Sequence, residues 1–130
     1  MRVLVVDDDR IVLASCERVL QAEGHEVITA VSSRAGLKIL EHGRFDLLLV
    51  DIKMPEYDGI ELTRVVQRSF PELPIIAMSG YSTDETVAEA LTIGAKRYIA
   101  KPFLPEELLQ AVAEVTGERP GPKPGPEGRP

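Results

Sequence analysis

An apolar segment near the start of the chain runs directly into three acidic residues, and this feature limits the possible folds more than any other. Residues 3–6 read Val-Leu-Val-Val, with no polar residue alternating among them. A strand without alternation is buried on both faces, which is typical of a parallel sheet covered by helices on each side. A second segment of this kind, residues 47–50, ends in Asp51. The pattern predicts two buried strands that bring carboxylates to the same edge of one sheet.

Two interpretations of Asp7, Asp8 and Asp9 are open. Asp is a favoured N-cap and suits the first turn of a helix, which explains one or two of these residues but neither the third nor Asp51. Two carboxylates about 4 Å apart repel each other by roughly 4 kcal/mol at an effective dielectric near 20. Such a cluster raises a pKa or binds a cation, and a small hard divalent ion such as Mg²⁺ suits carboxylate oxygens. We therefore expect a metal site rather than simple capping.

The composition argues against several classes of protein. A net charge of −6 and only 5% aromatic residues exclude a basic or base-stacking nucleic-acid surface. The single Cys16 cannot form an internal disulfide, which fits a protein of a reducing compartment. Its place in an apolar helical stripe indicates a residue of the core. No apolar run is long enough to span a bilayer. At 130 residues the chain holds one domain, which we expect to be cytoplasmic and to bind neither nucleic acid nor membrane directly.

Strand and helix signals alternate five times along the chain. Strands are predicted at residues 3–6, 25–30, 46–50, 75–78 and 98–100. Helices are predicted between the strands and after the last one. The second helix is capped by Ser32 and Ser33, and the last begins near Pro105. The first ends at Gly24, and its apolar stripe is formed by Val12, Ser15, Cys16, Val19 and Leu20. Five β-α units with right-handed crossovers predict a doubly wound parallel sheet with helices on both faces. Residues 118–130 are rich in Pro and Gly and contain no large apolar side chain, so we expect a folded domain over residues 1–117 followed by a disordered tail or linker stub.

Residues that carry chemistry follow the predicted strands. The first strand is followed by Asp7 and Asp8, the third by Asp51, the fourth by Ser79 and the fifth by Lys101. A carboxylate nucleophile, a divalent ion, a hydroxyl and an ammonium are the parts of a phosphoryl-transfer site. Each residue alone has an ordinary explanation as a turn cap, a loop hydroxyl or a surface charge. At one edge of one sheet, the set favours a functional site.

Four short motifs extend this interpretation. They are Val-Val-Asp-Asp at 5–8, Asp-Ile-Lys-Met-Pro at 51–55 with Asp58-Gly59 after it, Met-Ser-Gly at 78–80, and Lys-Pro-Phe at 101–103. In this order and at strand ends, they resemble the receiver domain of two-component response regulators over residues 2–116. The resemblance implies a flavodoxin-like α/β fold with five parallel strands in the order 2-1-3-4-5 and five flanking helices.

The resemblance also implies a role for each matching acidic residue. Asp51 is the expected phosphoacceptor, which receives a phosphoryl group from a sensor histidine kinase or a histidine phosphotransfer protein. Asp8, Asp51 and the backbone carbonyl of Lys53 are expected to bind Mg²⁺, with Mn²⁺ as an alternative ion. Asp7 is expected to support this metal site directly or through water. The domain would catalyse only its own phosphotransfer and autodephosphorylation, so it is not an enzyme with a separate substrate.

Further residues are expected to hold and report the phosphoryl group. Ser79 would donate to one phosphoryl oxygen and Lys101 would pair with another, and the Lys101–Pro102 peptide bond is expected to be cis. Tyr98 matches the switch aromatic that turns inward when the hydroxyl at position 79 moves; the alternative is an ordinary core tyrosine. The resulting change would be presented to a downstream protein or a second receiver on the face built from the fourth helix, fifth strand and fifth helix.

Three residues are specific to this chain. Lys53 and Tyr81 lie two positions after Asp51 and Ser79, and the resemblance implies that side chains at these positions affect the access of water to the acyl phosphate. A bulky Tyr81 is therefore expected to prolong the phosphorylated state. Ile11 lies with Ala14 and Arg18 on the helix face that docks a kinase, although a single exposed apolar residue is also common. For Tyr81, an exposed loop aromatic without a role is the alternative.

Other functions make different demands on the residues. A magnesium-dependent aspartyl-phosphate phosphatase or phosphotransferase usually carries a second Asp two residues after the nucleophile, where this chain has Lys53. A flavodoxin-like cofactor binder needs a hydroxyl- and glycine-rich phosphate loop after the first strand, where this chain has three Asp residues. An unphosphorylated receiver-like scaffold remains as a third alternative, although the acid, hydroxyl and lysine are all retained.

Overall fold

The computed structural model describes residues 1–53 and 59–117 and consists of strands and helices in strict alternation. All strand pairs are parallel, and their order in the sheet is β2-β1-β3-β4-β5, which confirms the predicted topology. Met54, Pro55 and Asp58 of the motifs, and the predicted tail at residues 118–130, lie outside the described residues. The elements are β1 (Arg2–Val6), α1 (Arg10–Ala22), β2 (Glu26–Ala30), α2 (Ser33–Glu41), β3 (Leu47–Asp51), α3 (Gly59–Ser69), β4 (Ile75–Ser79), α4 (Asp84–Thr92), β5 (Arg97–Ala100) and α5 (Pro105–Thr116).

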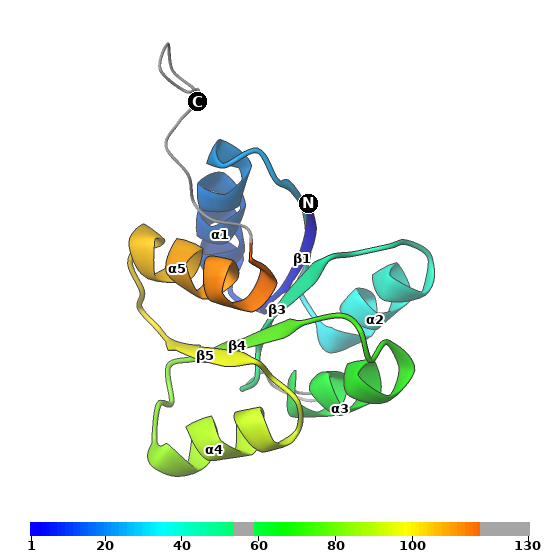
Figure 1. Cartoon of the computed structure of the whole chain (residues 1–130), viewed down its shortest axis with the longest axis vertical. Helices are drawn as coiled ribbons and strands as arrows, with labels where there is room; N and C mark the ends of the chain where they lie inside the picture. Colours follow the sequence, from blue (N-terminus) through cyan, green and yellow to red (C-terminus); the bar gives the residue numbers. More distant parts are fainter. Residues whose placement is uncertain (54–58, 118–130) are drawn as a thin grey trace.

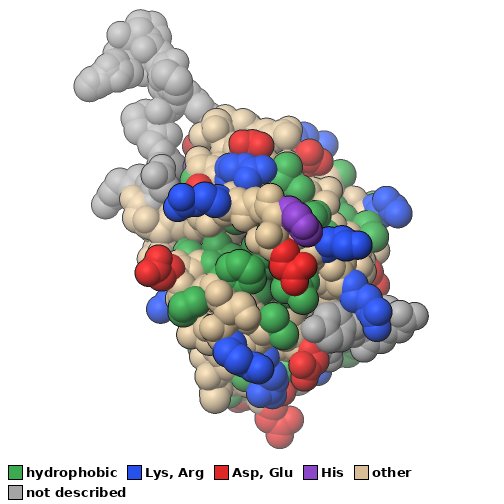
Figure 2. Space-filling model, turned by 90° about the vertical axis from the view of Figure 1, so that its right-hand side faces the viewer, with side chains coloured by type: hydrophobic (Ala, Val, Ile, Leu, Met, Phe, Trp, Pro, Cys, Tyr) green, Lys and Arg blue, Asp and Glu red, His purple; other side chains and the backbone are tan. Residues whose placement is uncertain are grey.

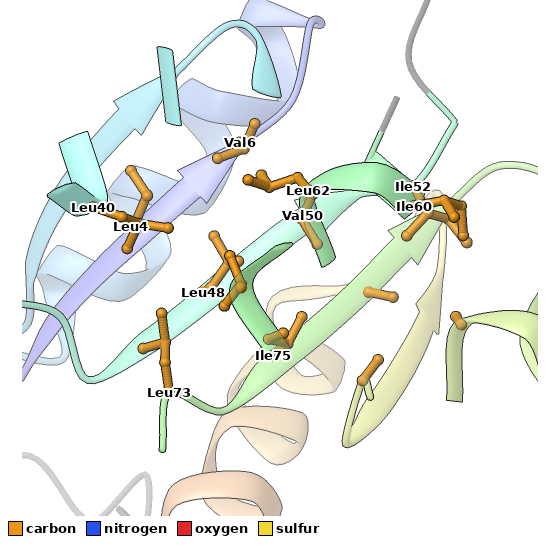
Figure 3. Close-up of a cluster of buried hydrophobic side chains, with 14 of the residues drawn as sticks. Leu4, Val6, Leu40, Leu48, Val50, Ile52, Ile60, Leu62, Leu73 and Ile75 are labelled. Carbon is orange, nitrogen blue, oxygen red and sulfur yellow. The ribbon is translucent and has the colours of Figure 1, made fainter. Parts of the chain in front are cut away.

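Helices cover both faces of the sheet, with α1 and α5 on one side and α2, α3 and α4 on the other (Figure 1). Each face has its own hydrophobic core. Figure 3 shows the core beneath α2 and α3, where side chains from β1, β3 and β4 meet those of the helices. The central strand β3 is buried along its whole length. This explains why the sequence of residues 47–50 shows no polar alternation.

The strands that carry the predicted site extend one residue further than the sequence indicated. Asp51 is the last residue of β3, where it is in register with Met78, and Ser79 is the last residue of β4, in register with Ala100. The pairing with neighbouring strands therefore includes both site residues, which a local pattern cannot show. At the other end, β2 begins at Glu26 rather than at residue 25, in register with Arg2.

The helix signals were mostly right. Ser32 caps α2 through its side-chain oxygen, which accepts a hydrogen bond from the backbone amide of Ala35 at 3.1 Å. Gly24 follows the end of α1 with a φ of 90°, a conformation that favours glycine. The predicted apolar stripe of α1 was wrong at Ser15, which is exposed, because the buried face runs through Leu13, Cys16 and Leu20.

On the face that carries α2 and α3, basic and acidic side chains are interspersed rather than gathered by sign (Figure 2). Within residues 1–53 and 59–117, no helix has the length and apolarity that a transmembrane span requires.

Candidate functional site

The carboxyl ends of β1 and β3 bring three carboxylates together. One oxygen from each of Asp7, Asp8 and Asp51 lies within 4.8 Å of the other two. Asp7 is completely buried, Asp51 is 5% exposed and Asp8 is exposed. Because β1 and β3 are adjacent in the sheet, their ends meet at one edge, as the sequence predicted.

The third acidic residue of the triplet has a different task. The side chain of Asp9 accepts a hydrogen bond from the backbone amide of Ile11 at 2.9 Å and so caps α1. The backbone amide of Asp9 in turn donates to Asp7 Oδ1 at 2.9 Å. Asp9 is therefore the helix cap, while Asp7 and Asp8 belong to the acidic cluster, for which a bound metal ion stays a prediction.

Lys101, which follows β5, lies between two of the carboxylates. Its ammonium nitrogen Nζ is 2.6 Å from Asp7 Oδ2 and 3.0 Å from Asp51 Oδ2. Its backbone amide donates to the Ser79 carbonyl at 2.9 Å, and the Lys101–Pro102 peptide bond is cis. Lys101 thus pairs with two carboxylates that lie 50 and 94 positions before it in the chain, because β1, β3 and β5 end at the same edge of the sheet.

Burial controls the electrostatics of this site. Burial raises the pKa of Asp7, and the nearby Lys101 ammonium offsets that effect only in part. Burial by itself lowers the pKa of Lys101, but its close contacts with the Asp7 and Asp51 carboxylates outweigh this effect, so the pKa is raised. Both shifts are what a desolvated cluster with an excess of negative charge produces.

The cluster has the charge and the ligand atoms for a divalent cation. Three carboxylates against one ammonium leave two negative charges when all are ionised. The buried Asp7 Oδ2 contacts Lys101 as an ion pair but accepts no well-aligned hydrogen bond. Carboxylate oxygens are the ligands that Mg²⁺ and Mn²⁺ prefer. The residues present therefore fit a small hard cation of this class.

A hydrogen-bond network connects Ser79 to Tyr98 through Tyr81. Ser79 is fully buried, and its Oγ accepts from the Tyr81 backbone amide at 2.9 Å. The Tyr98 hydroxyl donates to the Tyr81 backbone carbonyl at 3.0 Å, and Ser82 Oγ lies 3.4 Å from the same hydroxyl. From the sequence, Tyr81 was expected only to limit the access of water to the site. The bonds run through its backbone, so side-chain type carries no signal for this connection.

The remaining predicted residues are near the cluster or in the core. The Lys53 backbone amide donates to Asp51 Oδ1 at 2.9 Å, whereas its carbonyl as a metal ligand stays a prediction. Ile11 lies in the first turn of α1 and is 80% exposed, and Ala14 and Arg18 are exposed as well. Cys16 is buried, and burial raises the pKa of its thiol to about 12, which agrees with an unreactive core residue.

The fold and the site define an α/β domain with a carboxylate–lysine centre of the kind used in phosphoryl transfer. The family model for the response regulator receiver domain matches residues 3–113, and the chain belongs to this family. The transcriptional regulatory protein PrrA of Mycobacterium bovis is 37% identical over 118 residues, which are 91% of this chain and 51% of PrrA. The response regulator protein FleR of Pseudomonas aeruginosa is 35% identical over 112 residues, which are 86% of this chain and 24% of FleR.

A similar solved structure is a CheY-like receiver domain protein from Methanospirillum hungatei. It has a TM-score of 0.82 and 38% sequence identity, with 87% of this chain and 90% of that chain covered. Domains of this family are phosphorylation-dependent signalling switches of two-component systems rather than catalysts of metabolic reactions. This chain spans about half or less of the length of the two curated relatives.

Proposed function

We propose that this domain accepts a phosphoryl group on Asp51 from the phosphohistidine of a sensor histidine kinase or a histidine phosphotransfer protein. The observation that supports this most strongly is the position of Asp51, nearly buried, 3.0 Å from an ammonium and beside two further carboxylates. An Asp51 carboxylate oxygen attacks phosphorus, the phosphorus–nitrogen bond to the histidine breaks, and an acyl phosphate remains on Asp51. Hydrolysis of that acyl phosphate by water returns the domain to its starting state.

A divalent ion completes the proposed site. Asp8, Asp51 and the carbonyl of Lys53 would hold Mg²⁺ or Mn²⁺, with Asp7 as a direct or water-mediated partner. When bound, the ion neutralises the charge of the transferred phosphoryl group. Lys101 already lies within 3.0 Å of Asp51 Oδ2 and would pair with a second phosphoryl oxygen. Ser79 would donate its hydroxyl hydrogen to a third.

The same geometry supports a conformational signal. If Ser79 turns its hydroxyl to the phosphoryl group, Oγ no longer accepts from the Tyr81 amide, a bond that is 2.9 Å long in this structure. The Tyr81 carbonyl holds the Tyr98 hydroxyl, so the change reaches β5 in one step. We propose that the face formed by α4, β5 and α5 presents this signal to a downstream protein or a second receiver.

The exposed start of α1 supports a docking role. Ile11 is 80% exposed and lies two residues after the Asp9 cap, close in the chain to Asp7 and Asp8 of the acidic cluster. An apolar side chain at the edge of a charged site suits the packing of a partner helix. We propose that the kinase or phosphotransfer protein contacts Ile11, Ala14 and Arg18 while its histidine faces Asp51.

A direct experiment tests phosphorylation itself. The purified protein is incubated with Mg²⁺ and acetyl phosphate, and intact-mass spectrometry follows one added phosphoryl group; beryllofluoride serves as a stable mimic. We expect modification of the wild type in Mg²⁺, none in EDTA, and none in Asp51→Asn. A folded wild-type protein that takes up no phosphoryl group and shows no response to Mg²⁺ would contradict the proposal. Turnover of an added phosphate ester would instead support the phosphatase alternative, although position 53 is Lys rather than Asp.

A further inference from the structure

We propose that Gly59, held in place by Thr63, is a positioning residue for the phosphoacceptor Asp51. This inference rests on the proposed phosphorylation of Asp51 and concerns how its carboxylate is kept in place. The pair lies in the first turn of α3 and contacts no predicted substrate, metal or phosphoryl atom.

The backbone of α3 begins in direct contact with the end of β3. A Cβ atom on Gly59 would lie 2.1 Å from the Asp51 carbonyl oxygen, 2.7 Å from Ile52 Cα and 2.8 Å from the Asp51 carbonyl carbon. All three are backbone atoms, so no side-chain rotation could make room. Gly59 has no positive φ, unlike Gly24, Gly94 and Gly117. Space, and not conformational freedom, is therefore the reason for glycine at this position.

The end of β3 cannot easily move away from Gly59. The Ile52 backbone amide donates to the Met78 carbonyl at 3.1 Å, which extends the sheet pairing past Asp51. The Lys53 amide donates to Asp51 Oδ1 at 2.9 Å and ties the carboxylate to its own turn. Three contacts therefore confine the phosphoacceptor. Pairing with β4 holds the end of the strand, the Lys53 amide holds the carboxylate, and the start of α3 lies against the Asp51 backbone.

Gly59 is fixed from within its own helix. The fully buried Thr63 donates its hydroxyl hydrogen to the Gly59 carbonyl at 2.7 Å. The next residue, Ile60, lies beside Ile52 in the hydrophobic core, as Figure 3 shows. The Thr63 bond opposes unwinding of this turn, and the packing of Ile60 beside Ile52 opposes displacement of the turn from Asp51.

A small displacement of Asp51 should have a large effect on phosphotransfer. The carboxylate must keep its contact with Lys101, now 3.0 Å, and its place in the three-carboxylate cluster. A misplacement of about 1 Å costs roughly 100-fold in rate when a reaction depends on alignment. A Cβ at Gly59 requires a movement of about this size, because the 2.1 Å approach must open to at least 3.0 Å.

Two other glycines serve as matched controls. A Cβ on Gly36, in α2, would lie 2.8 Å from Val6 Cγ2, which is a side-chain atom at the end of β1 and not backbone of the strand that carries Asp51. A Cβ on Gly80, next to Ser79, would meet nothing within 4 Å. Gly36→Ala therefore tests crowding of a side chain at a helix–strand contact near the site, and Gly80→Ala tests an added methyl group near the site without crowding.

The three alanine variants are compared for phosphorylation by acetyl phosphate in Mg²⁺, at conditions where circular dichroism shows each protein folded. We expect Gly59→Ala to react about 100-fold more slowly than wild type, and Gly36→Ala and Gly80→Ala to react within about twofold of it. A folded Gly59→Ala variant that reacts at the wild-type rate would overturn the inference. If the wild type itself is not phosphorylated, the proposed function fails instead, so the two failures are distinguishable.

Thr63 provides a second test if Gly59→Ala does not fold. Thr63→Val keeps the shape of the side chain and removes the hydroxyl, whereas Thr63→Ser keeps the hydroxyl. We expect Thr63→Val to slow phosphorylation several-fold and Thr63→Ser to restore the rate, because the bond to the Gly59 carbonyl returns. Equal rates for Thr63→Val and wild type would overturn the role of Thr63. Equal losses in Thr63→Val and Thr63→Ser would show that packing, and not the hydroxyl, matters.

Discussion

Replacing Asp7 by Asn should stabilise the metal-free protein. Asp7 is completely buried in a cluster with Asp8 and Asp51, and burial raises its pKa. A raised pKa means that the native state disfavours the ionised carboxylate relative to the unfolded chain. Asn has almost the same shape, and its Oδ1 can still accept from the Asp9 amide, now 2.9 Å from Asp7 Oδ1. The variant removes the buried charge, and because its Nδ2 donor replaces Asp7 Oδ2, the Lys101 ammonium must turn from it to its other partner, Asp51.

The size of the effect follows from opposing terms. At an effective dielectric near 20, the 2.6 Å contact with Lys101 favours the Asp7 charge by about 6 kcal/mol, and Asp51 within 4.8 Å opposes it by about 3 kcal/mol. Desolvation of a buried carboxylate costs several kcal/mol and more than offsets the remaining attraction, as the direction of the pKa shift shows. Lys101 keeps Asp51 as a partner in the variant. We expect Asp7→Asn to raise the free energy of unfolding by about 1–2 kcal/mol.

Urea unfolding in EDTA and in Mg²⁺ tests this expectation. Asp9→Asn is the control, because Asn caps a helix as well as Asp does, so its free energy of unfolding should match wild type within a few tenths of a kcal/mol. In Mg²⁺ at ten times Kd, wild type should gain about 1.4 kcal/mol, and Asp7→Asn should gain less because a carboxylate is missing from the cluster. The reasoning is refuted if Asp7→Asn is less stable than wild type in EDTA.

Three further expectations concern pH, lifetime and docking. The native pKa of Asp7 lies above its ordinary value of 3.8, so above that pH the native state binds more protons than the unfolded chain. In EDTA, wild type should therefore lose stability relative to Asp7→Asn as the pH rises above about 4. Tyr81→Ala should speed loss of the phosphoryl group several-fold, because it removes an aromatic ring that is proposed to screen the site from water, whereas Tyr81→Phe should not. Ile11→Lys should slow phosphotransfer from the cognate kinase at least tenfold, which corresponds to about 1.4 kcal/mol. The reaction of this variant with acetyl phosphate should stay unchanged. Leu91→Lys, at an exposed apolar residue of α4, is the control that should not slow phosphotransfer from the kinase.

Each of these expectations has a contrary outcome. Parallel pH profiles for wild type and Asp7→Asn would show that Asp7 does not carry a raised pKa. Equal phosphoryl lifetimes in wild type and Tyr81→Ala would make Tyr81 an ordinary exposed aromatic residue. An Ile11→Lys protein that receives phosphoryl groups from its kinase at the wild-type rate would remove the start of α1 from the docking surface.

Much of the fold follows from local pattern. Uninterrupted apolar segments at residues 3–6 and 47–50 predicted strands buried on both faces, and the alternation with helices predicted a parallel sheet. In a parallel sheet all strands end at one edge, so the positions of Asp7, Asp51, Ser79 and Lys101 in the chain were enough to predict that they meet. The structure places Asp7 and Asp51 in one acidic cluster, with Lys101 in contact with both.

Other features depend on contacts between distant parts of the chain. Only the tertiary structure divided the acidic triplet into the cap Asp9 and the cluster residues Asp7 and Asp8. It alone showed that Gly59 is needed because α3 starts against the backbone of Asp51. The physical reason is that side-chain periodicity determines which face of an element is buried and where the element ends. The separation between two elements depends instead on strand register and helix packing, to which every layer of the domain contributes.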